Sequence, residues 1–531
     1  MGVPDPPASP VSTLTLTFTY NLAHMALQRV PINNFRGGLN TRDGPFDLQP
    51  NESPDLMNVT LTSLVGQLQV RQGKTVVGST APGVIDHARQ LALQGGARYL
   101  MLSINGKIVS CDQSGNFVTR FTGTAGTIWD FATTPDASGN DRLWMMNGVD
   151  PPQKWDGVTS ATVAWAGTPP NGNRILVWRN KMVVIGVSAA PSRLYLSPAG
   201  DPELTTGAYD FIDLRGDDFE LGTLTELQVL ADRLYIFKER SVWLMSDPTT
   251  FANRRVGEPG CNSRFQSDVI EDKLYFFNRQ GLWSTGGVTV ALETGSITNL
   301  FPVRLNSAAM GKVRVLGTQD SYPRILMTIP VDGSTTNNLM IELVPHINFR
   351  RIGGRRYLLL PAFMLHTFSA TTLVNWKPTA TGSWGIYGGD PNGKLYQYFQ
   401  GQTDDTQPIS AWWQSSWMAI QGEEPFERIR RVNVELSGDA VVDIFEDFAQ
   451  APRFSAALPN PPVSTGDPIN WDAGHWDTSG GIWDPGTVYR FARLRPESRA
   501  RFHSIRFRTL PGGQPFLINV AEFAVRGGKE H

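Results

Sequence analysis

Cysteine is scarce in this chain, and neither charge is in excess. Only two cysteines, Cys111 and Cys261, occur among 531 residues, which excludes a disulfide scaffold and a cysteine-based zinc site. The 47 Lys and Arg residues nearly balance the 49 Asp and Glu residues, giving a net charge of −2. Proteins whose affinity comes from phosphate contacts usually carry a clear basic excess, so this balance argues against a dedicated nucleic-acid binder.

Long hydrophobic runs are also absent. No segment approaches the roughly 18 consecutive apolar residues of a transmembrane helix, so we expect no membrane span. The N-terminal residues MGVPDPP lack the basic start and the apolar run of a secretory signal. Residues 1–34 are treated as an N-terminal extension.

Recognisable catalytic motifs are missing as well. The sequence contains no His-x-x-x-His pair of a metalloprotease, no Gly-x-Ser-x-Gly elbow and no phosphate-binding P-loop. It also lacks the Ser-x-Asp-x-Gly-x-Thr-Trp boxes of a sialidase. We therefore expect that the chain is not an enzyme and binds no cofactor. A glycosidase, which needs only two suitably spaced carboxylates, stays open as a third hypothesis.

Glycine, proline and tryptophan are plentiful, at 52, 37 and 15 residues. Glycine and proline occur where a chain turns often, and tryptophan packs well on half-buried sheets. Hydrophobic residues make up 40% of the chain and charged residues 18%, enough for a sizeable core. This composition favours an all-β fold.

A short phrase recurs along the chain: a turn, a basic residue and then an apolar-aromatic run. The basic residues of its copies are Arg98, Arg142, Lys181, Arg233, Lys273, Arg324 and Lys394. Intervals of 39 to 52 residues separate the first six copies, and 70 residues separate the last two. Periods of roughly 40–50 residues that each hold several short strands are typical of propeller blades. The pattern predicts a β-propeller of six or seven blades over residues 35–401.

The pattern changes after Gly401. Residues 402–408 are polar and linker-like. Segments of alternating polarity follow and predict strands of an antiparallel sheet with one wet face, at residues 411–419, 429–436, 441–445, 504–508 and 516–525. We expect a C-terminal β-sandwich over residues 402–531.

The segment that precedes the first repeat carries a recognisable set of residues. An apolar residue, a glycine pair, a proline, an acidic residue, an asparagine and an arginine close to a glycine follow one another as Phe35, Gly37, Gly38, Pro50, Glu52, Asn58, Arg71 and Gly73. This segment resembles the N-terminal segment of propeller-type tail proteins of tailed bacteriophages, including the nozzle proteins of short-tailed phages. We expect it to open the first blade, with a strand starting at residues 68–70.

The resemblance implies a structural component of a virion tail, either a nozzle or a distal tail or tip protein. Such a protein forms part of the axial assembly through which DNA is retained and ejected, without sequence-specific binding. Its implied partners are other tail proteins, namely an adaptor or tail tube and the fibres. Closed rings form through head-to-tail interfaces, so a homo-oligomeric ring is expected. The implied location is the virion tail, after assembly in the host cytoplasm.

Three surface features allow a functional and a structural interpretation. A loop rich in Asp and Trp could contact a partner or a glycan, or could pin an irregular segment, through Trp471, Asp472, Trp476, Asp477, Trp483 and Asp484. It makes a host-surface carbohydrate-binding tail protein the leading alternative function. A basic loop could meet DNA or an acidic partner, or form a solvated face, through Arg350, Arg351, Arg355 and Arg356. Arginines between residues 490 and 508, interleaved with Phe491, Phe502 and Phe507, fit either strands with one wet face or a subunit interface.

Overall fold

The structure is a computed structural model in which about half of the residues lie in strands and 3% in helices, which confirms the all-β prediction. The described residues are 28–32, 34–61, 66–93, 98–204, 208–215, 222–287, 289–318, 320, 323–344, 350–352, 355–357, 361–419, 427–460, 490–496 and 498–527.

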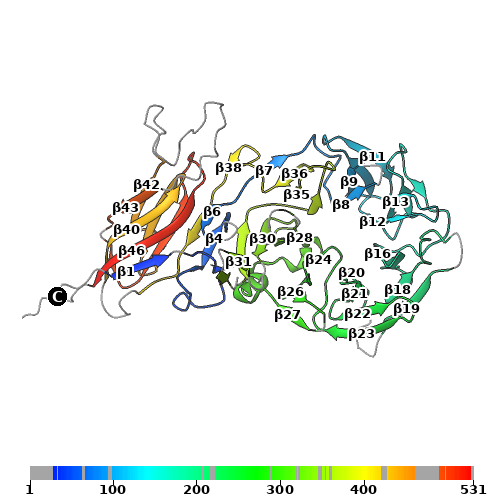
Figure 1. Ribbon diagram of the computed structural model, residues 1–531, viewed down its shortest axis with the longest axis horizontal. Coiled ribbons are helices and arrows are strands. Elements are labelled where there is room, and N and C mark those ends of the chain that lie inside the picture. Colours follow the sequence, from blue (N-terminus) through cyan, green and yellow to red (C-terminus); the bar gives the residue numbers. More distant parts are fainter. Residues whose placement is uncertain are drawn as a thin grey trace, which may run out of the picture.

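Seven sheets form the blades of the propeller and are arranged as a ring (Figure 1). Six of them have four strands, and the sheet of blade seven is extended to six strands by β37 and β38. Blades one to three consist of β8 (His87–Ala92), β9 (Arg98–Ile104), β10 (Lys107–Cys111), β11 (Phe117–Thr122), β12 (Asp130–Pro135), β13 (Asp141–Met146), β14 (Gln153–Trp155), β15 (Val163–Ala164), β16 (Arg174–Trp178), β17 (Lys181–Ile185), β18 (Arg193–Leu196) and β19 (Asp210–Asp213). Blades four and five consist of β20 (Glu226–Leu230), β21 (Arg233–Phe237), β22 (Val242–Asp247), β23 (Ala252–Gly257), β24 (Ser267–Ile270), β25 (Lys273–Asn278), β26 (Gly281–Thr285) and β27 (Val290–Leu292). Blades six and seven consist of β28 (Arg314–Gly317), β29 (Ile325–Ile329), β30 (Leu339–Val344), β33 (Ala362–His366), β34 (Val374–Trp376), β35 (Gly385–Gly389), β36 (Leu395–Tyr398) and β7 (Lys74–Val76).

The ring is closed by a strand from the N-terminal side of the chain. Strand β7 is the fourth strand of blade seven, where Val76 pairs with Tyr396 and Lys74 with Tyr398. The next strand along the chain, β8, then starts blade one and lies beside β34 of blade seven. The first and last blades are thereby joined by pairing between distant parts of the sequence.

The recurring phrase marks the second strand of blades one to six. These strands are almost entirely buried, as in β21 and β25, because they lie in the middle of a blade between two neighbouring blades. The polar residue before the basic one forms the turn that the phrase predicts. Asn180 and Asp232 both have positive φ, at 58° and 60°, and each sits in a two-residue hairpin turn.

The last copy of the phrase is out of phase, and this explains the interval of 70 residues. Lys394 precedes the third strand of blade seven rather than the second. Blade six also contains an inserted hairpin between β30 and β33, made of β31 (Arg350–Ile352) and β32 (Arg355–Tyr357). The basic segment that was expected as a loop thus has the backbone of a short hairpin, because three-residue strands are too short to show an alternating pattern. Its proposed contact with DNA or an acidic partner stays a prediction.

Two further sheets form a second body, which we call the two-sheet domain. One sheet contains β1 (Gln28–Ile32), β5 (Val59–Leu61), β6 (Leu68–Val70), β40 (Glu427–Ser437), β43 (Arg490–Leu494), β44 (Arg499–Ala500) and β46 (Leu517–Gly527). The other contains β4 (Asp55–Met57), β39 (Trp412–Gln414), β41 (Ala440–Glu446), β42 (Phe454–Leu458) and β45 (His503–Thr509). Their buried side chains share one hydrophobic cluster, which continues into blades five and six. The predicted strands are present here, while the sandwich itself stays a prediction.

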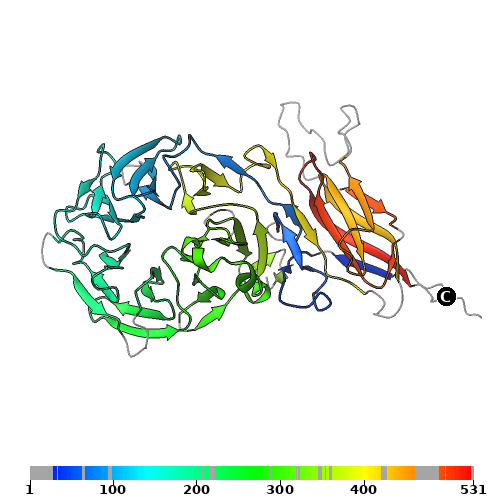
Figure 2. The same ribbon diagram turned by 180° about the vertical axis from the view of Figure 1, so that it is seen from behind.

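The N-terminal strands correct the expected domain boundaries. Strand β1 pairs with β46 over its whole length, β4 pairs with β39, and β6 pairs with β46. Figure 2 shows these N-terminal strands in blue beside the C-terminal strands in orange and red. Residues 28–32 and 55–70 therefore do not open the first blade. The sequence of such a short strand does not indicate which other strand it pairs with. The strand at residues 68–70 could therefore be predicted, but the sheet to which it belongs could not.

The remaining elements connect these bodies. Between blades five and six lie η1 (Gly295–Ile297), α1 (Leu300–Arg304) and η2 (Ser307–Lys312). Two small pairs complete the chain, β2 (Gly38–Leu39) with β3 (Glu52–Ser53) and β37 (Thr403–Asp404) with β38 (Gln407–Pro408). None of the helices in the described part of the chain is long and apolar enough to cross a membrane.

Candidate functional site

The family-like residues gather where the propeller meets the two-sheet domain. We call this region the interdomain joint: residues 34–73, with β33 and its following residues 367–368, and the linker 401–414. Phe35 is fully buried there, with its ring edge on Trp413 at a centroid distance of 4.9 Å. Phe35 is thus an anchor of the shared hydrophobic core.

Arg71 is the centre of the joint. Its side chain is fully buried, yet its guanidinium donates two hydrogen bonds to the carboxylate of Asp404, at 2.8 and 2.7 Å. Its Nε donates to Oδ1 of Asn58 at 2.9 Å, and the guanidinium carbon lies 3.6 Å from the ring centroid of Phe368. A bidentate ion pair with an aromatic face is strong and directional, so Arg71 holds the linker against the propeller.

Asn58 links three chain segments through one side chain. Its amide donates to Oγ1 of Thr367 at 3.0 Å and to the carbonyl oxygen of Ser410 at 2.7 Å. Its Oδ1 accepts from Arg71 and from the backbone N–H of Thr367 at 2.9 Å. Its φ of 56° lies in the left-handed region, which asparagine tolerates better than most residues. The sequence thus places asparagine where the backbone and the network both require it.

The glycines of the motif allow backbone segments to approach one another. A Cβ on Gly73 would lie 1.8 Å from the carbonyl oxygen of Thr403. A Cβ on Gly38, whose φ is 63°, would lie 2.8 Å from the backbone nitrogen of Phe363 in blade six. One on Gly37 would lie 2.5 Å from the side chain of Glu52. Any other residue would push the joint apart.

The other two motif residues act locally. Glu52 accepts hydrogen bonds from the Asn40 side chain at 3.1 Å and from the Gln49 backbone at 2.9 Å. Both bonds tie down the segment between β2 and β3. Pro50 is exposed, in the turn just before β3. Seven of the eight motif residues therefore take part in contacts of the joint, and Pro50 forms part of the turn before β3.

A second buried polar group lies beside this network. Glu342 of β30 accepts hydrogen bonds from Arg324 at 3.0 Å, from Thr60 at 3.2 Å and pairs with His366 Nε2 at 2.8 Å. Thr60 belongs to the two-sheet domain, so this contact also crosses the joint. Burial lowers the pKa of His366 despite the neighbouring Glu342. The joint therefore combines a shared apolar core with paired polar groups.

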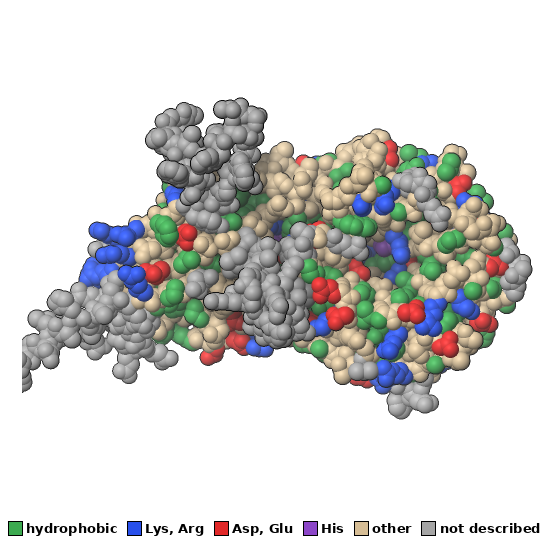
Figure 3. Space-filling view, viewed as in Figure 1, with side chains coloured by type: hydrophobic (Ala, Val, Ile, Leu, Met, Phe, Trp, Pro, Cys, Tyr) green, Lys and Arg blue, Asp and Glu red, His purple; other side chains and the backbone are tan. Residues whose placement is uncertain are grey.

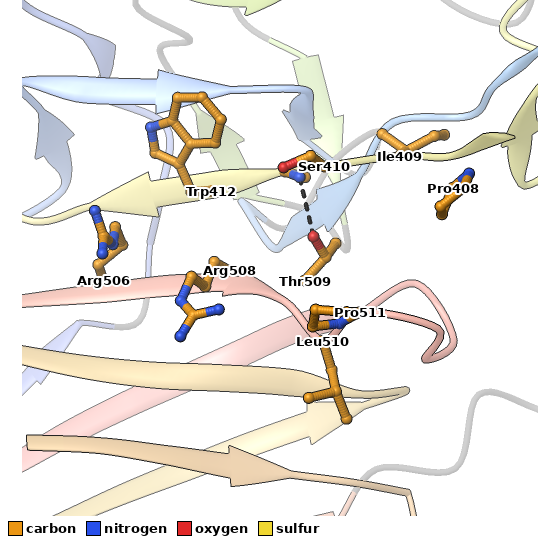
Figure 4. A pocket seen from close by; sticks show the side chains of 10 residues that line it. Pro408, Ile409, Ser410, Trp412, Arg506, Arg508, Thr509, Leu510 and Pro511 are labelled. Carbon is orange, nitrogen blue, oxygen red and sulfur yellow. Dashed lines mark hydrogen bonds between the residues drawn. The ribbon is translucent and has the colours of Figure 1, made fainter.

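A cavity of about 330 Å³ opens where the linker enters the two-sheet domain (Figure 4). Trp412 lies on the linker wall, and Arg506 and Arg508 lie on the β45 wall. Both arginines bond the buried carboxylate of Asp443, at 3.0 and 2.8 Å. Burial alone would raise the pKa of Asp443, but the hydrogen bonds from Arg508, Ser455 and Arg506 outweigh it, so the pKa is lowered. Both arginines of this wall thus share the carboxylate of Asp443.

The predicted surface sites are placed differently. The Asp and Trp loop, with Trp471, Asp472, Trp476, Asp477, Trp483 and Asp484, lies outside the described residues. The backbone of the basic segment forms the β31–β32 hairpin of blade six. In the arginine-rich region Phe507 is fully buried, whereas Phe491 is 80% exposed.

Several residues of the joint could not be found from the sequence. Thr367, Asp404, Glu342 and His366 lie in segments without a motif, and their partners are far away in the chain. Asp404 and Arg71, for example, are separated by 333 positions. Only the arginine of this pair belonged to a recognisable phrase.

Comparisons with known proteins find similar solved structures only at low sequence identity. No protein-family model matches the chain, and no curated protein matches it. Among solved structures, YCF48 from Cyanidioschyzon merolae is similar over 61% of this chain and 98% of its own, with 12% identity and a TM-score of 0.38. A streptogramin B lyase is similar over 61% of this chain and 95% of its own, with the same identity and TM-score. Both are propeller proteins.

Proposed function

We propose that this chain is a structural component of a bacteriophage tail, a nozzle or a distal tail or tip protein. The observation that carries the proposal is the placement of its family-like residues. All eight lie in the interdomain joint, where Arg71 bonds Asp404 and Asn58 spans three segments. Residues that resemble a tail-protein phrase thus perform a mechanical task here, which is to hold two bodies in one orientation.

A rigid joint suits a part that transmits force. The hydrophobic core is continuous from blades five and six into the two-sheet domain, so the domains cannot rotate without exposing apolar surface. The N-terminal strands pair in both bodies, β1 with β46 and β7 with β36. A subunit of a tail ring needs this stiffness, because the ring holds the path of DNA under pressure.

The proposed ring requires contacts between copies of the chain. Phe491 on β43 is 80% exposed, and Arg493 on the same strand is exposed beside it. Aromatic residues and arginine are enriched at the cores of protein interfaces. We assign this strand to the contact with a second copy. Phe491→Asp should then reduce assembly, while Val163→Asp on β15, another exposed apolar strand position, in the propeller, should leave it intact.

The test is a cryo-EM map of intact virions that carry a label at the C-terminus of this chain. A ring of labels on the axis at the distal end of the tail is the expected result, and unlabelled virions are the control. Absence of the label from virions would overturn the proposal. The carbohydrate-binding alternative would then be tested with Trp476→Ala and Trp483→Ala, which should abolish binding to host-surface glycans.

A further inference from the structure

A second buried site lies on the axis of the propeller. Its wall comes from the first strands of six blades, β8, β16, β20, β24, β28 and β34, together with Phe265, which precedes β24. The cavity has a volume of about 220 Å³. Figure 3 shows basic and histidine side chains in the hollow at the centre of the ring. We call this the axial cavity.

One of its arginines is neutralised by the protein. Arg174 donates to the fully buried Asp130 at 2.9 Å and to the fully buried Glu226. Burial alone would lower the pKa of Arg174, but these two carboxylates outweigh it and raise the pKa. Arg174 is therefore a structural cation. Asp130 and Glu226, the two carboxylates on its side of the cavity, are both paired with it.

Three other arginines around the cavity lack such a partner. Arg89 donates to the Phe131 carbonyl at 2.7 Å, and Arg264 donates to the Asn173 carbonyl at 2.6 Å. Arg314 likewise donates only to backbone carbonyls. Among the described residues, no carboxylate lies within ion-pair distance of these three guanidiniums. The carboxylates of Asp130, Glu226 and Asp268 act on these arginines only from beyond ion-pair distance. A buried or half-buried cation without a bonded carboxylate is unfavourable, so the arrangement favours an anion in the cavity.

Three polar atoms in the cavity wall have no hydrogen-bond partner within the described structure. They are Nε of Arg314, whose residue is 5% exposed, Oγ of Ser267, whose residue is 7% exposed, and Nε2 of His87. All three residues line the axial cavity. Buried polar atoms without partners are rare in folded proteins, and here three of them flank one cavity.

The backbone at this site is strained. Phe265 has a φ of 65°, an uncommon conformation for an aromatic residue. His87 stacks on its ring at 3.8 Å, and the guanidinium carbons of Arg174, Arg264 and Arg314 lie 5.3 to 5.4 Å from its centroid. Strained residues of this kind concentrate at ligand sites, because the surrounding structure must hold them in place. Phe265 thereby positions the cations around the cavity.

Asp268 is the carboxylate on the wall, and its charge is already engaged. Its oxygens accept hydrogen bonds from the backbone N–H groups of Val269 and Gly317, both at 2.8 Å. Burial raises the pKa of Asp268 from the ordinary value of an aspartate to about 6. It therefore opposes an anion less than an exposed carboxylate would.

We propose that the axial cavity binds a small phosphate-bearing anion, with Arg89, Arg314 and Ser267 as its donors. Guanidinium groups match phosphate oxygens in geometry and charge. The cavity is smaller than the roughly 300–1,000 Å³ of pockets for drug-sized ligands, so it selects a small molecule over a nucleic-acid strand. Half of its lining residues are apolar, with Leu176 and Val315 among them. This site is separate from the joint and does not depend on the tail assignment.

The experiment is a calorimetric titration of the full chain with inorganic phosphate, at constant ionic strength set by chloride. Saturable binding with one phosphate per chain is expected. Arg314→Met should weaken it about tenfold or more, because a charge-assisted bond is lost. Ser267→Ala, which keeps every charge, should weaken it about threefold. Arg233→Met, the same change at an exposed position of blade four, should leave it unchanged.

Each result decides the proposal. Absence of saturable binding by the unaltered chain would overturn it. An equal loss in Arg233→Met and Arg314→Met would also overturn it, since the effect would then reflect overall charge. If Arg314→Met does not fold, Ser267→Ala decides: unchanged affinity there rejects the site, and weaker affinity with an unchanged melting temperature supports it.

Discussion

Two buried arginines of this protein have opposite surroundings. Arg71 in the joint is 1% exposed and meets the carboxylate of Asp404 with two hydrogen bonds and Asn58 with a third. Arg314 in the axial cavity is 5% exposed, donates only to backbone carbonyls and leaves its Nε without a partner. The two side chains have the same chemistry and are both buried, but only Arg71 has a carboxylate partner and a hydrogen bond from its Nε.

The difference separates a structural group from a binding group. A network whose donors are all used holds the fold and has nothing left to offer a ligand. A buried cation with open donors reduces stability until an anion enters, and such a compromise is typical of functional sites. The joint and the cavity should therefore respond differently to the same kind of substitution, and an equal response would refute the distinction.

The largest effect is expected at Arg71. Arg71→Met leaves Asp404 and Asn58 without their partner inside the joint and should lower the free energy of unfolding by about 4 kcal/mol. Urea titrations followed by tryptophan fluorescence measure the change. Arg42→Met is the control, because its guanidinium is exposed and pairs only with neighbouring Asp43; it should leave the midpoint in place. A midpoint unmoved by Arg71→Met would refute the structural role.

The next effect concerns His87 in the cavity. Burial lowers the pKa of His87 from 6.5 to about 4, while it faces Asp130 of β12, Arg174 of β16 and Arg314 of β28. The unfolded chain therefore holds this proton more tightly, and the stability present above pH 6.5 is lost as the pH falls toward 4. The shift corresponds to about 3 kcal/mol.

Substitution at His87 tests this sign. The unaltered protein should lose stability between pH 7 and pH 4.5. In His87→Gln this loss should be smaller by about 2 to 3 kcal/mol, measured by urea titration at both pH values. Asp268, whose raised pKa acts in the opposite direction over the same range, is present in both proteins and cancels in the difference. An identical acid loss in His87→Gln would show that this histidine does not set the profile.

A smaller loss is expected from a glycine of the joint. Gly73→Ala places a methyl group 1.8 Å from the carbonyl oxygen of Thr403 and should lower the free energy of unfolding by about 2 kcal/mol. Gly286→Ala serves as the control, because a Cβ there meets its first neighbour at 3.7 Å. Equal stability of the two variants in thermal unfolding would show that the backbone of the joint accommodates the added methyl group at no cost in stability.

The smallest effect on stability is expected at Arg314. Arg314→Met removes a buried cation without a carboxylate partner, so the free energy of unfolding should stay within about 1 kcal/mol of the unaltered protein or increase. Differential scanning calorimetry without phosphate makes the measurement. A loss as large as that of Arg71→Met would mean that both arginines are structural, and the distinction between the two regions would fail.

The blades could be predicted because their signals are local. An Asp or Asn in a tight turn, a basic residue and a buried apolar run follow each other within ten residues, as at Asp232 and β21. The partner of a three-residue strand has no such signal. Strand β6 was expected at residues 68–70, but its pairing with β46 places it in the two-sheet domain.

The candidate sites divide in the same way. Some residues of the joint could be singled out, since Asn58, Arg71 and Gly73 stand within one recognisable phrase, but we expected that phrase to open the first blade rather than to join two bodies. The axial cavity could not, because Arg89 and Arg314 come from strands more than 200 residues apart and neither belongs to a motif. Their proximity arises only when the seven blades close into a ring.

The sequence by itself determined the all-β class, the recurring blade strands and the residues of the N-terminal phrase, because turns and buried runs are encoded by neighbouring residues. Only the tertiary structure decided that β7 closes the ring, that Arg71 meets Asp404 and that one axial arginine is neutralised while three are not. These outcomes depend on pairing between distant segments, and that pairing is fixed by the packing of the whole chain rather than by any local pattern.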